Sequence, residues 1–274
     1  MTTVATTPTV AAEHSKIEAR PAGFFTDVSV VAGRAMRAVP RDLETVIPPV
    51  LIALFFFLVN VGTLQDITQN NIANFDYTAF QLPTAILLGV TGVSRAPALV
   101  IDVQDGYFDR LLLTPMRRLA ILLGHLCADI AVAAALTVPI LVVGFVMGVR
   151  FESGPLGILV FILIAAAWSL AFTGFGYAVA LKTGNPGAVQ SMFLLFFPFL
   201  FLTTSYVPRS QLSGWLDVVA GLNPVTYLLE GMRSLVMVGW DASVLAEAVL
   251  AVVAVGAISM TMCFAALRGR IKRG

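Results

Sequence analysis

The sequence contains little charge and little cysteine. Of its 274 residues, 12% are Asp, Glu, Lys or Arg and 58% are hydrophobic, and the mean hydropathy is +0.89. This composition is too apolar for a soluble domain and indicates a protein surrounded by lipid. The two cysteines, Cys127 and Cys263, fall inside apolar segments. Packing is the usual role of a cysteine in such a segment, so we expect no disulfide.

Several kinds of active site are also missing from the sequence. It has no G-x-x-x-x-G-K-[ST] phosphate loop, no Cys/His cluster with metal-ligand spacing and no nucleophile-base pair. We therefore expect no catalytic residue, no metal and no cofactor in this chain. Charged residues are sparse inside the apolar segments, whereas ion-coupled carriers usually need several at mid-membrane depth. Any energy that the protein uses should therefore come from a partner.

Long apolar segments predict an all-α polytopic membrane protein with six transmembrane helices. Each segment is long enough to cross a bilayer, and charged or turn-forming residues separate the segments. We expect Pro83 and Pro97 to bend the second span. The predicted spans are residues 46–64, 77–100, 119–149, 153–181, 188–206 and 243–267.

The distribution of basic residues predicts that both termini are cytoplasmic. Fourteen of the 17 Lys and Arg residues fall before the first span, between residues 95 and 118, at Lys182, or after the last span. Only Arg150, Arg209 and Arg233 fall in segments assigned to the outside. Positive charge accumulates on the cytoplasmic side of membrane proteins. Residues 1–22 are expected to form a disordered cytoplasmic tail and residues 268–274 a basic cytoplasmic tail.

Residues 23–41 predict an amphipathic helix that lies at the inner membrane surface. Apolar residues recur at helical spacing, and arginines recur at three and four residues. Such a helix places its apolar face at the acyl boundary and its arginines on phosphate headgroups. The alternative is an ordinary solvated basic helix. The residues that we assign to this interface helix include Phe24, Val28, Arg34 and Arg37.

Residues 104–124 form an island of charge and turn chemistry between the second and third spans. Tyr107, Phe108 and Leu111 give its short helix an apolar stripe at helical spacing. One interpretation is an element that lies on the membrane surface. We favour a docking helix that buries this stripe in a groove of a soluble partner. The predicted docking residues are Asp105, Gly106, Tyr107, Phe108, Asp109, Arg110 and Leu111.

His125 and Asp129 lie four residues apart near the cytoplasmic end of the third span, and therefore on one helical face. A carboxylate at this depth is costly unless it is paired, so a proton relay is one hypothesis. The interpretation that we favour is that both side chains bond to neighbouring helices or to an arginine of the loop.

Aromatic residues are dense in the first and fifth spans. In the fifth span they surround Pro198, and the resulting bend could line a path for a bulky apolar cargo. The same side chains are equally expected in helix packing or against lipid. The candidate path residues are Phe55, Phe56, Asn60, Phe193, Phe196 and Phe197.

The outside segment at residues 207–241 is too hydrophobic to be a free loop. Asn223 and Pro224 predict the start of a helix, with Asn as cap and Pro in the first turn. We expect a re-entrant or interfacial helical hairpin, with Glu230 and Arg233 either pairing or lining an outer gate. The candidate gate residues are Asn223, Pro224, Tyr227, Glu230 and Arg233.

Two motifs resemble those of a known family. The run Asp105-Gly106-Tyr107-Phe108-Asp109-Arg110-Leu111, with Thr114-Pro115, Arg118 and Gly124, is similar to the cytoplasmic signature of type-2 ABC (ABC-2) exporter permeases of the daunorubicin-resistance type. Leu222-Asn223-Pro224-Val225-Thr226-Tyr227, continuing to Glu230-Gly231-Met232-Arg233, resembles the segment before the last span of those permeases. The resemblance covers roughly residues 24–270. One departure is that Tyr107-Phe108 is bulkier than the Thr-Leu common in the family.

The resemblance implies an exporter subunit in the bacterial inner membrane. Two such subunits, identical or different, would pair and rest on two copies of a separate ATPase that binds ATP and Mg. The helix near Gly106 would be the coupling helix, and the hairpin would close a cargo path lined by spans one, two and five. The implied cargo is a hydrophobic or amphiphilic drug, lipid or lipid-linked glycan, with membrane lipids as surroundings and no nucleic-acid partner.

Two other functions were weighed. One is a scaffold or channel subunit that works without an ATPase. The other is an integral-membrane lipid phosphotransferase, whose D-G-x-x-A-R opening resembles the run from Asp105 to Arg110. Asp109 stands at the Ala position of that motif, Leu119 stands at its Gly position, and the later metal-binding aspartates are missing. We therefore favour the permease.

Overall fold

The computed structural model describes residues 23–38, 43–71, 75–105 and 118–271. These residues form helices and connecting turns, and they contain no strand. The predicted all-α class is therefore confirmed. Several predicted segments lie outside the described residues: the N-terminal tail, residues 39–41 of the interface helix, residues 106–111 of the docking helix and residues 272–274 of the C-terminal tail. Residues 268–271 of that tail belong to the last helix. The helices are α1 (Phe24–Ala38), α2 (Leu43–Asn71), α3 (Tyr77–Thr91), α4 (Ala96–Gln104), α6 (Arg118–Val146), α7 (Gly154–Thr183), α8 (Pro186–Phe201), the 3-10 turn η2 (Arg209–Gln211), α9 (Trp215–Leu222), α10 (Pro224–Met237) and α11 (Ala242–Ile271).

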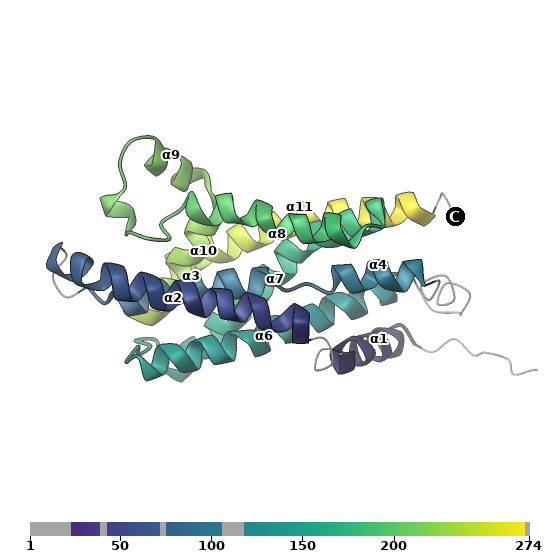
Figure 1. Ribbon diagram of the computed structural model, residues 1–274, viewed down its shortest axis with the longest axis horizontal. Helices are drawn as coiled ribbons and strands as arrows, with labels where there is room; N and C mark the ends of the chain where they lie inside the picture. The colour runs from purple at the N-terminus through teal and green to yellow at the C-terminus, as the bar shows by residue number, and fades with distance from the viewer. Residues whose placement is uncertain (1–22, 39–42, 72–74, 106–117, 272–274) are drawn as a thin grey trace, which may run out of the picture.

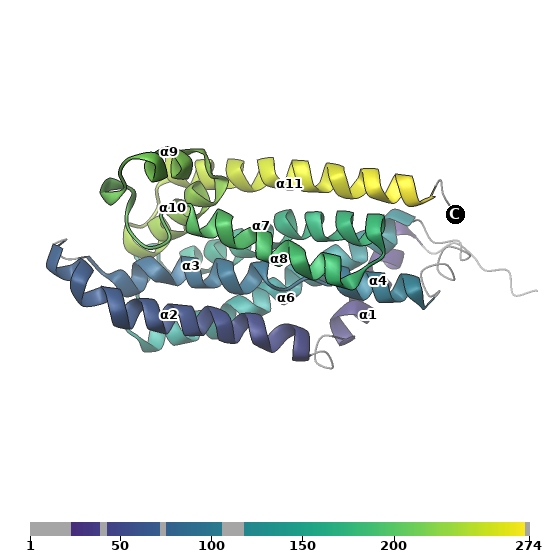
Figure 2. The same cartoon turned by 45° about the horizontal axis from the view of Figure 1, so that its top comes forward.

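The long helices run roughly side by side, with α9 near one end of the bundle and the C-terminus at the other (Figures 1 and 2). Five stretches are long and apolar enough to cross a membrane: Val46–Thr68, Tyr77–Ile101, Leu119–Val146, Gly154–Thr183 and Ala242–Gly269. The apolar helix α8 has only 16 residues. Five of the six predicted spans therefore correspond to helices of spanning length.

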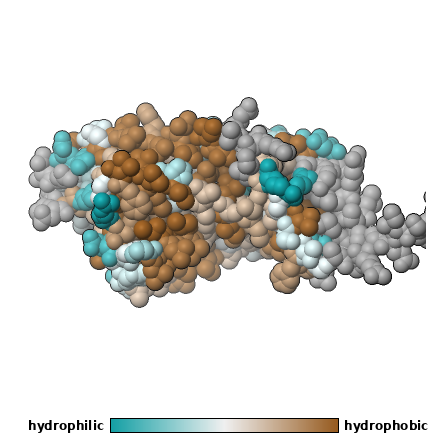
Figure 3. Space-filling model, turned by 90° about the horizontal axis from the view of Figure 1, so that it is seen from below, coloured by the Kyte–Doolittle hydropathy of each residue, from teal (hydrophilic) through white to brown (hydrophobic). Residues whose placement is uncertain are grey.

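The outer surface of the bundle is mostly hydrophobic. Figure 3 shows a broad apolar area over the middle of the molecule, with hydrophilic residues toward both ends. Leu51 of α2, Val142 of α6 and Val253 of α11 are each more than half exposed, at 59%, 52% and 59%. Large contiguous apolar surfaces are rare on soluble monomers and normal where a protein faces lipid. The apolar surface therefore agrees with the apolar composition, which indicates a protein surrounded by lipid.

Helix α3 is the centre of the bundle. All 15 of its residues are buried, and α2, α6, α7 and α10 pack around it. Side-chain hydrogen bonds fasten it to α7, since Trp168 Nε1 donates to Thr91 Oγ1 at 3.0 Å and Ser169 Oγ donates to Val90 O at 3.2 Å. Polar groups inside an apolar bundle must be paired in this way, because no water is present to replace the bond.

The second predicted span is a broken helix. Helix α3 ends at Thr91 and α4 begins at Ala96, so residues 92–95 interrupt the span. Pro97 is the second residue of α4. Proline has no N–H to donate and disfavours helical geometry in the residue before it, so it suits the start of a new helix. The expected disturbance at Pro97 is thus a break, whereas Pro83 lies inside the continuous helix α3.

Helix α1 packs along the first turns of α6. Val31 and Ala35 form its buried apolar contacts, and Gly124 of α6 permits the close approach. A Cβ added at Gly124 would lie only 2.5 Å from Val31 Cβ, which is well inside van der Waals contact. Gly124, the glycine of the cytoplasmic signature, therefore allows α1 to pack closely on α6 in this chain.

Candidate functional site

The start of the predicted docking segment lies at the end of the bundle that holds the C-terminus (Figure 1). Asp105 directly follows α4, is exposed, and donates its backbone N–H to Ile101 O at 2.9 Å. Gln104 Nε2 donates to Gly184 O at 2.9 Å. This bond ties the end of α4 to the turn between α7 and α8. The bundle therefore holds the end of α4 in place, at the point where the chain continues into residues 106–111.

A helix, α1, covers most of the residues predicted for the interface helix, and it lies at the same end of the bundle (Figure 1). Phe24 and Val28 are half-buried, and the ring of Phe24 packs edge-on against Phe25 at 5.7 Å between centroids. Arg34 is half-buried, whereas Arg37 is exposed and donates from Nε to Gly33 O at 3.1 Å. The helix thus buries one stripe, which includes Asp27 as well as Val31 and Ala35, and exposes Arg37.

Asp129 of α6 joins three helices. It is only 2% exposed. Its Oδ1 accepts the backbone N–H of Arg95 at 2.8 Å, and its Oδ2 accepts the hydroxyl of Tyr177 at 2.7 Å. The favoured interpretation, bonding to neighbouring helices, is confirmed for this residue, although the group from residue 95 is its backbone N–H. The carboxylate satisfies a backbone donor that the break between α3 and α4 exposes.

His125, one turn before Asp129, bonds within its own helix. Its Nδ1 lies 2.9 Å from Ile121 O, and the side chain is buried. The histidine therefore has a hydrogen-bonding role in packing at this position.

Helices α2, α3 and α8 meet around a small cavity whose mostly apolar lining includes a few polar side chains. Two of the predicted path residues, Phe56 and Asn60, line it. The other lining residues are not among the predicted path residues, although polar residues at helical spacing in an otherwise apolar span are a usable signal for the polar ones. These other lining residues include Gln81, Thr84, Phe201, Ser205 and Tyr206.

The remaining path residues lie elsewhere. Phe55 is 62% exposed on the outer surface of α2. Phe196 is fully buried against α7, with its ring 6.1 Å from that of Trp168. Phe197 stacks on Phe201 at 5.9 Å. The side chain of Phe193 lies outside those that the structure describes.

The cavity is closed in this conformation. Its volume is about 20 Å³, whereas sites for small organic molecules usually occupy ~300 Å³ or more. Gln81 is 1% exposed and donates from Nε2 to Tyr77 Oη at 3.1 Å. Its Oε1 has no hydrogen-bond partner among the described residues. A buried polar atom without a hydrogen-bond partner in the described ranges therefore lies at this cavity.

Asn223 performs the predicted capping role at the start of α10. Its Oδ1 accepts the N–H of Val225 at 3.0 Å. Its Nδ2 also donates to Phe199 O at 2.6 Å and Leu202 O at 3.0 Å. One side chain thus begins α10 and fastens it to the end of α8. Pro224 occupies the first helical position, as expected, and Tyr227 Oη donates to Gly221 O at 2.6 Å.

Arg233 of α10 is buried against α3. Its Nε donates to Phe80 O at 3.0 Å, its Nη1 to Thr204 Oγ1 at 3.0 Å and its Nη2 to Thr84 Oγ1 at 3.2 Å. In the described part of the chain it forms no ion pair with Glu230. The outer-gate alternative stays a prediction, whereas the pairing alternative is not met. The physical reason is that α10 turns Arg233 toward α3, where oxygen acceptors surround the guanidinium.

The chain is similar in sequence to known transporter permeases. Daunorubicin resistance ABC transporter permease protein DrrB1 of Streptomyces coeruleorubidus is 26% identical over 199 residues, covering 70% of this chain and 67% of that protein. Probable doxorubicin resistance ABC transporter permease protein DrrC of Mycobacterium tuberculosis is 24% identical over 220 residues, covering 79% of each chain.

More distant relatives include the putative transport permease ycf38 of Porphyra purpurea, 28% identical over 142 residues, which covers 49% of this chain and 47% of that protein. The family model described as ABC-2 type transporter matches residues 28–237. That range begins in α1 and ends at the last residue of α10. The chain therefore belongs to the ABC-2 transporter membrane family.

Proposed function

We propose that this chain is the membrane-spanning subunit of an ATP-driven exporter that moves a hydrophobic or amphiphilic compound outward. The observation that carries this proposal is the family match over residues 28–237. Relatives named for daunorubicin and doxorubicin resistance favour a drug-like cargo. ATP and Mg would bind to a separate ATPase, present in two copies, and a second permease subunit would complete the exporter.

The proposed topology has six spans in a bacterial inner membrane with both termini cytoplasmic. Helix α8 and the residues that follow it form the fifth span, and α9 with α10 forms the outer hairpin. The position of Asp105, the α7–α8 turn and the end of α11 at one end of the bundle supports this arrangement (Figure 2). Lys182 and Arg268 lie at that end, as a cytoplasmic assignment requires.

Residues 105–111 act as the coupling helix in this proposal, and α1 braces it. The coupling segment follows α4 directly, and α4 packs against α7 and α8. A push on the coupling segment therefore reaches the fifth span and the break at residues 92–95 without passing through a free loop. Helix α1 packs on α6, which resumes the chain after the coupling segment. Rigid helices of this kind transmit a displacement over a long distance.

The proposed cargo path runs along α2, α3 and α8. Asn60, Gln81 and Thr84 place polar groups there, in surroundings that are mostly aromatic and aliphatic. Such a lining suits a molecule with a large apolar body and a few hydroxyl or amine groups. The present cavity is too small for it, so transport requires α2 or α8 to move away from α3. Arg233 and Asn223 line the outer end, where the hairpin would open.

Co-purification in mild detergent tests the coupling assignment. The double variant Phe108→Asp with Leu111→Asp should insert normally but lose the ATPase, because charge would replace the apolar docking stripe. The matched control is Val218→Asp with Leu222→Asp, which charges two exposed residues of α9. This control should retain the ATPase. Equal retention of the ATPase by both double variants would refute the docking assignment.

A further inference from the structure

An apolar groove runs along the bundle between α6 and α11. Both helices pack against α7 without extensive contact with each other. The groove has a volume of about 450 Å³, which is within the ~300–1,000 Å³ range of small-molecule sites. It is therefore a far larger space than the closed cavity at α2, α3 and α8.

Small residues form the floor of this groove. Ala167 and Ala171 of α7 and Gly256 of α11 line it, and an added Cβ at Gly256 would lie 3.4 Å from Ala171 Cβ. Close packing of α11 on α7 leaves the longer side chains of the neighbouring turns to form the walls. The walls include Cys127, Ile130, Met260 and Phe264. The lining is almost wholly apolar.

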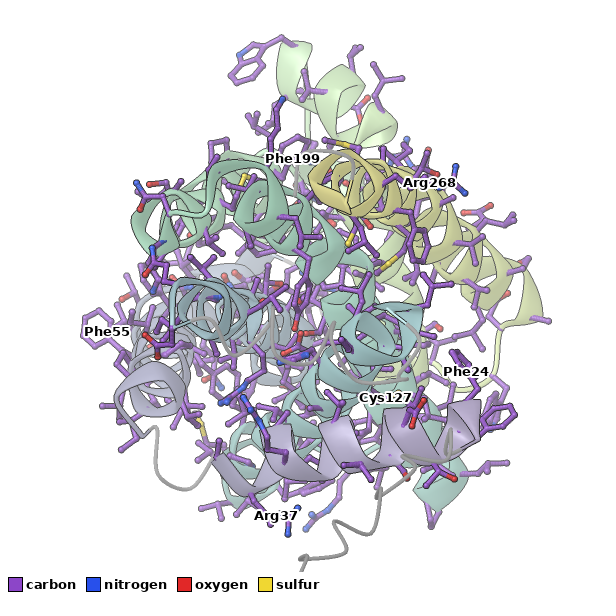
Figure 4. All side chains as sticks on the ribbon, turned by 90° about the vertical axis from the view of Figure 1, so that its right-hand side faces the viewer. Phe24, Arg37, Phe55, Cys127, Phe199 and Arg268 are labelled. Atoms are coloured by element: carbon purple, nitrogen blue, oxygen red, sulfur yellow. The ribbon has the colours of Figure 1, made fainter. Side chains whose placement is uncertain are left out.

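The groove lies on the side of the bundle away from α2. Figure 4 looks onto the C-terminal end and shows Cys127 and Arg268 toward one side, with Phe55 of α2 on the other. Its lining comes from the first half of α6 and from the middle and second half of α11. Under the proposed topology, the end of the groove nearest Phe264 lies in the cytoplasmic leaflet. An acyl chain of that leaflet could therefore enter the groove from the side.

A positive charge stands at the end of the groove. Met260, Phe264 and Arg268 follow one another at intervals of four residues on α11, so they share a helical face. Arg268 is exposed one turn beyond Phe264. Under the proposed topology this position is close to the headgroups, where arginine recognises phosphate through paired hydrogen bonds.

We infer that this groove is a binding site for one anionic phospholipid of the cytoplasmic leaflet. An acyl chain fills the apolar channel between α6 and α11, and Arg268 binds the phosphate of the headgroup. The combination of an apolar channel with a cation at one end favours a phospholipid over a helix of a second subunit, which would leave Arg268 without a phosphate. The site is separate from the proposed cargo path.

Native mass spectrometry in detergent tests this inference on the full-length chain with its co-purifying subunits. Added palmitoyl-oleoyl phosphatidylglycerol should be retained about tenfold more than the matching phosphatidylcholine, because Arg268 adds a charge-assisted bond. Cys127→Trp fills the channel and Arg268→Gln removes the cation, so each should reduce retention about tenfold. The controls are Leu51→Trp on the exposed surface of α2 and Lys182→Gln at the same end of the bundle.

Both controls should bind the lipid as the unaltered protein does. Equal retention of the two lipids, or equal loss in variants and controls, would overturn the inference. A second readout needs no variant, because Cys127 is exposed and Cys263 is buried. Phosphatidylglycerol should slow alkylation of Cys127 by a lipid-soluble maleimide, and phosphatidylcholine should not. Alkylation that is unaffected by phosphatidylglycerol would overturn the inference even if a variant failed to fold.

Discussion

The guanidinium carbon of Arg233 lies 3.5 Å from the centre of the Phe80 ring, and Arg233 Nε donates to the carbonyl oxygen of the same residue at 3.0 Å. Arg233 thus contacts Phe80 through both its ring and its backbone. Phe80 belongs to the central helix α3, and Arg233 belongs to α10 of the proposed outer hairpin. This contact holds the hairpin onto the centre of the bundle.

Replacing Arg233 by Met should loosen the hairpin and lower stability. The change leaves the buried oxygens of Thr84, Thr204 and Phe80 without their donor, and each unsatisfied group costs roughly 1–3 kcal/mol. The melting temperature in detergent should therefore fall by several degrees. Arg209→Met is the control, because Arg209 forms only an exposed ion pair with Asp217 at 3.9 Å. A similar fall in melting temperature in both variants would contradict a particular contribution of the buried Arg233 contacts to stability.

Truncating Asp129 to Ala should disturb the break between α3 and α4. The N–H of Arg95 would lose its acceptor and Tyr177 would lose a buried hydrogen-bond partner. Since α4 leads into the coupling segment, nucleotide-dependent transport should fall more than insertion does. Tyr177→Phe removes only one of the two bonds, so it should have a smaller effect on transport. An unchanged transport rate in Asp129→Ala would contradict this role.

Gly124→Ala should push α1 away from α6, because the new methyl group would overlap Val31. Cross-linking between cysteines placed on α1 and α6 can measure the displacement, and co-purified ATPase can measure its consequence. Adding Val31→Ala should restore part of the contact. The rescue is partial because the backbone nitrogen of Ala32 also lies 3.1 Å from the added Cβ. If Val31→Ala restored none of the contact, the effect of Gly124→Ala would not arise from overlap with Val31.

Asp241 caps α11 and should make the start of that helix sensitive to acid. Hydrogen bonds from the Ser243 hydroxyl and the Val244 N–H lower the pKa of the Asp241 carboxyl below its ordinary value of 3.8. A lowered native pKa stabilises the folded state above the unfolded pKa, and this contribution is lost as the pH falls through the native pKa. The melting temperature of the unaltered protein should therefore fall as the pH falls through the native pKa of Asp241.

Asp241→Asn is the matched variant for the acid experiment, because it keeps a capping oxygen and cannot titrate. The difference in melting temperature between the two proteins should shrink as the pH falls through the native pKa of Asp241. A difference that stays constant across that window would contradict the assignment.

The sequence predicts the membrane class and the helical order because both depend on local composition. Asn223 and Pro224 show their roles directly, since capping is decided by neighbouring residues. The partner of Arg233 is decided instead by how α10 packs on α3, which no spacing of three residues reveals. The polar side chain of Gln81 stands out in an apolar span, but its place in a cavity depends on helices that are distant in the sequence.

The break after Thr91 is predictable from the sequence only in part. Pro97 indicates that the helix is disturbed, but the length of the interruption depends on Asp129, which lies on another helix and accepts the freed N–H. Phe55 and Phe196 were grouped with Phe56 as aromatic path residues. The orientation of each helix separates these residues, because Phe55 faces outward and Phe196 packs against α7.

The most direct test of the central claim is transport by the purified chain and its ATPase in sealed lipid vesicles. A fluorescent anthracycline should move across the membrane only with ATP and Mg, and the movement should stop in the Phe108→Asp, Leu111→Asp variant. Movement that persists at the same rate without the ATPase or without nucleotide would contradict the account.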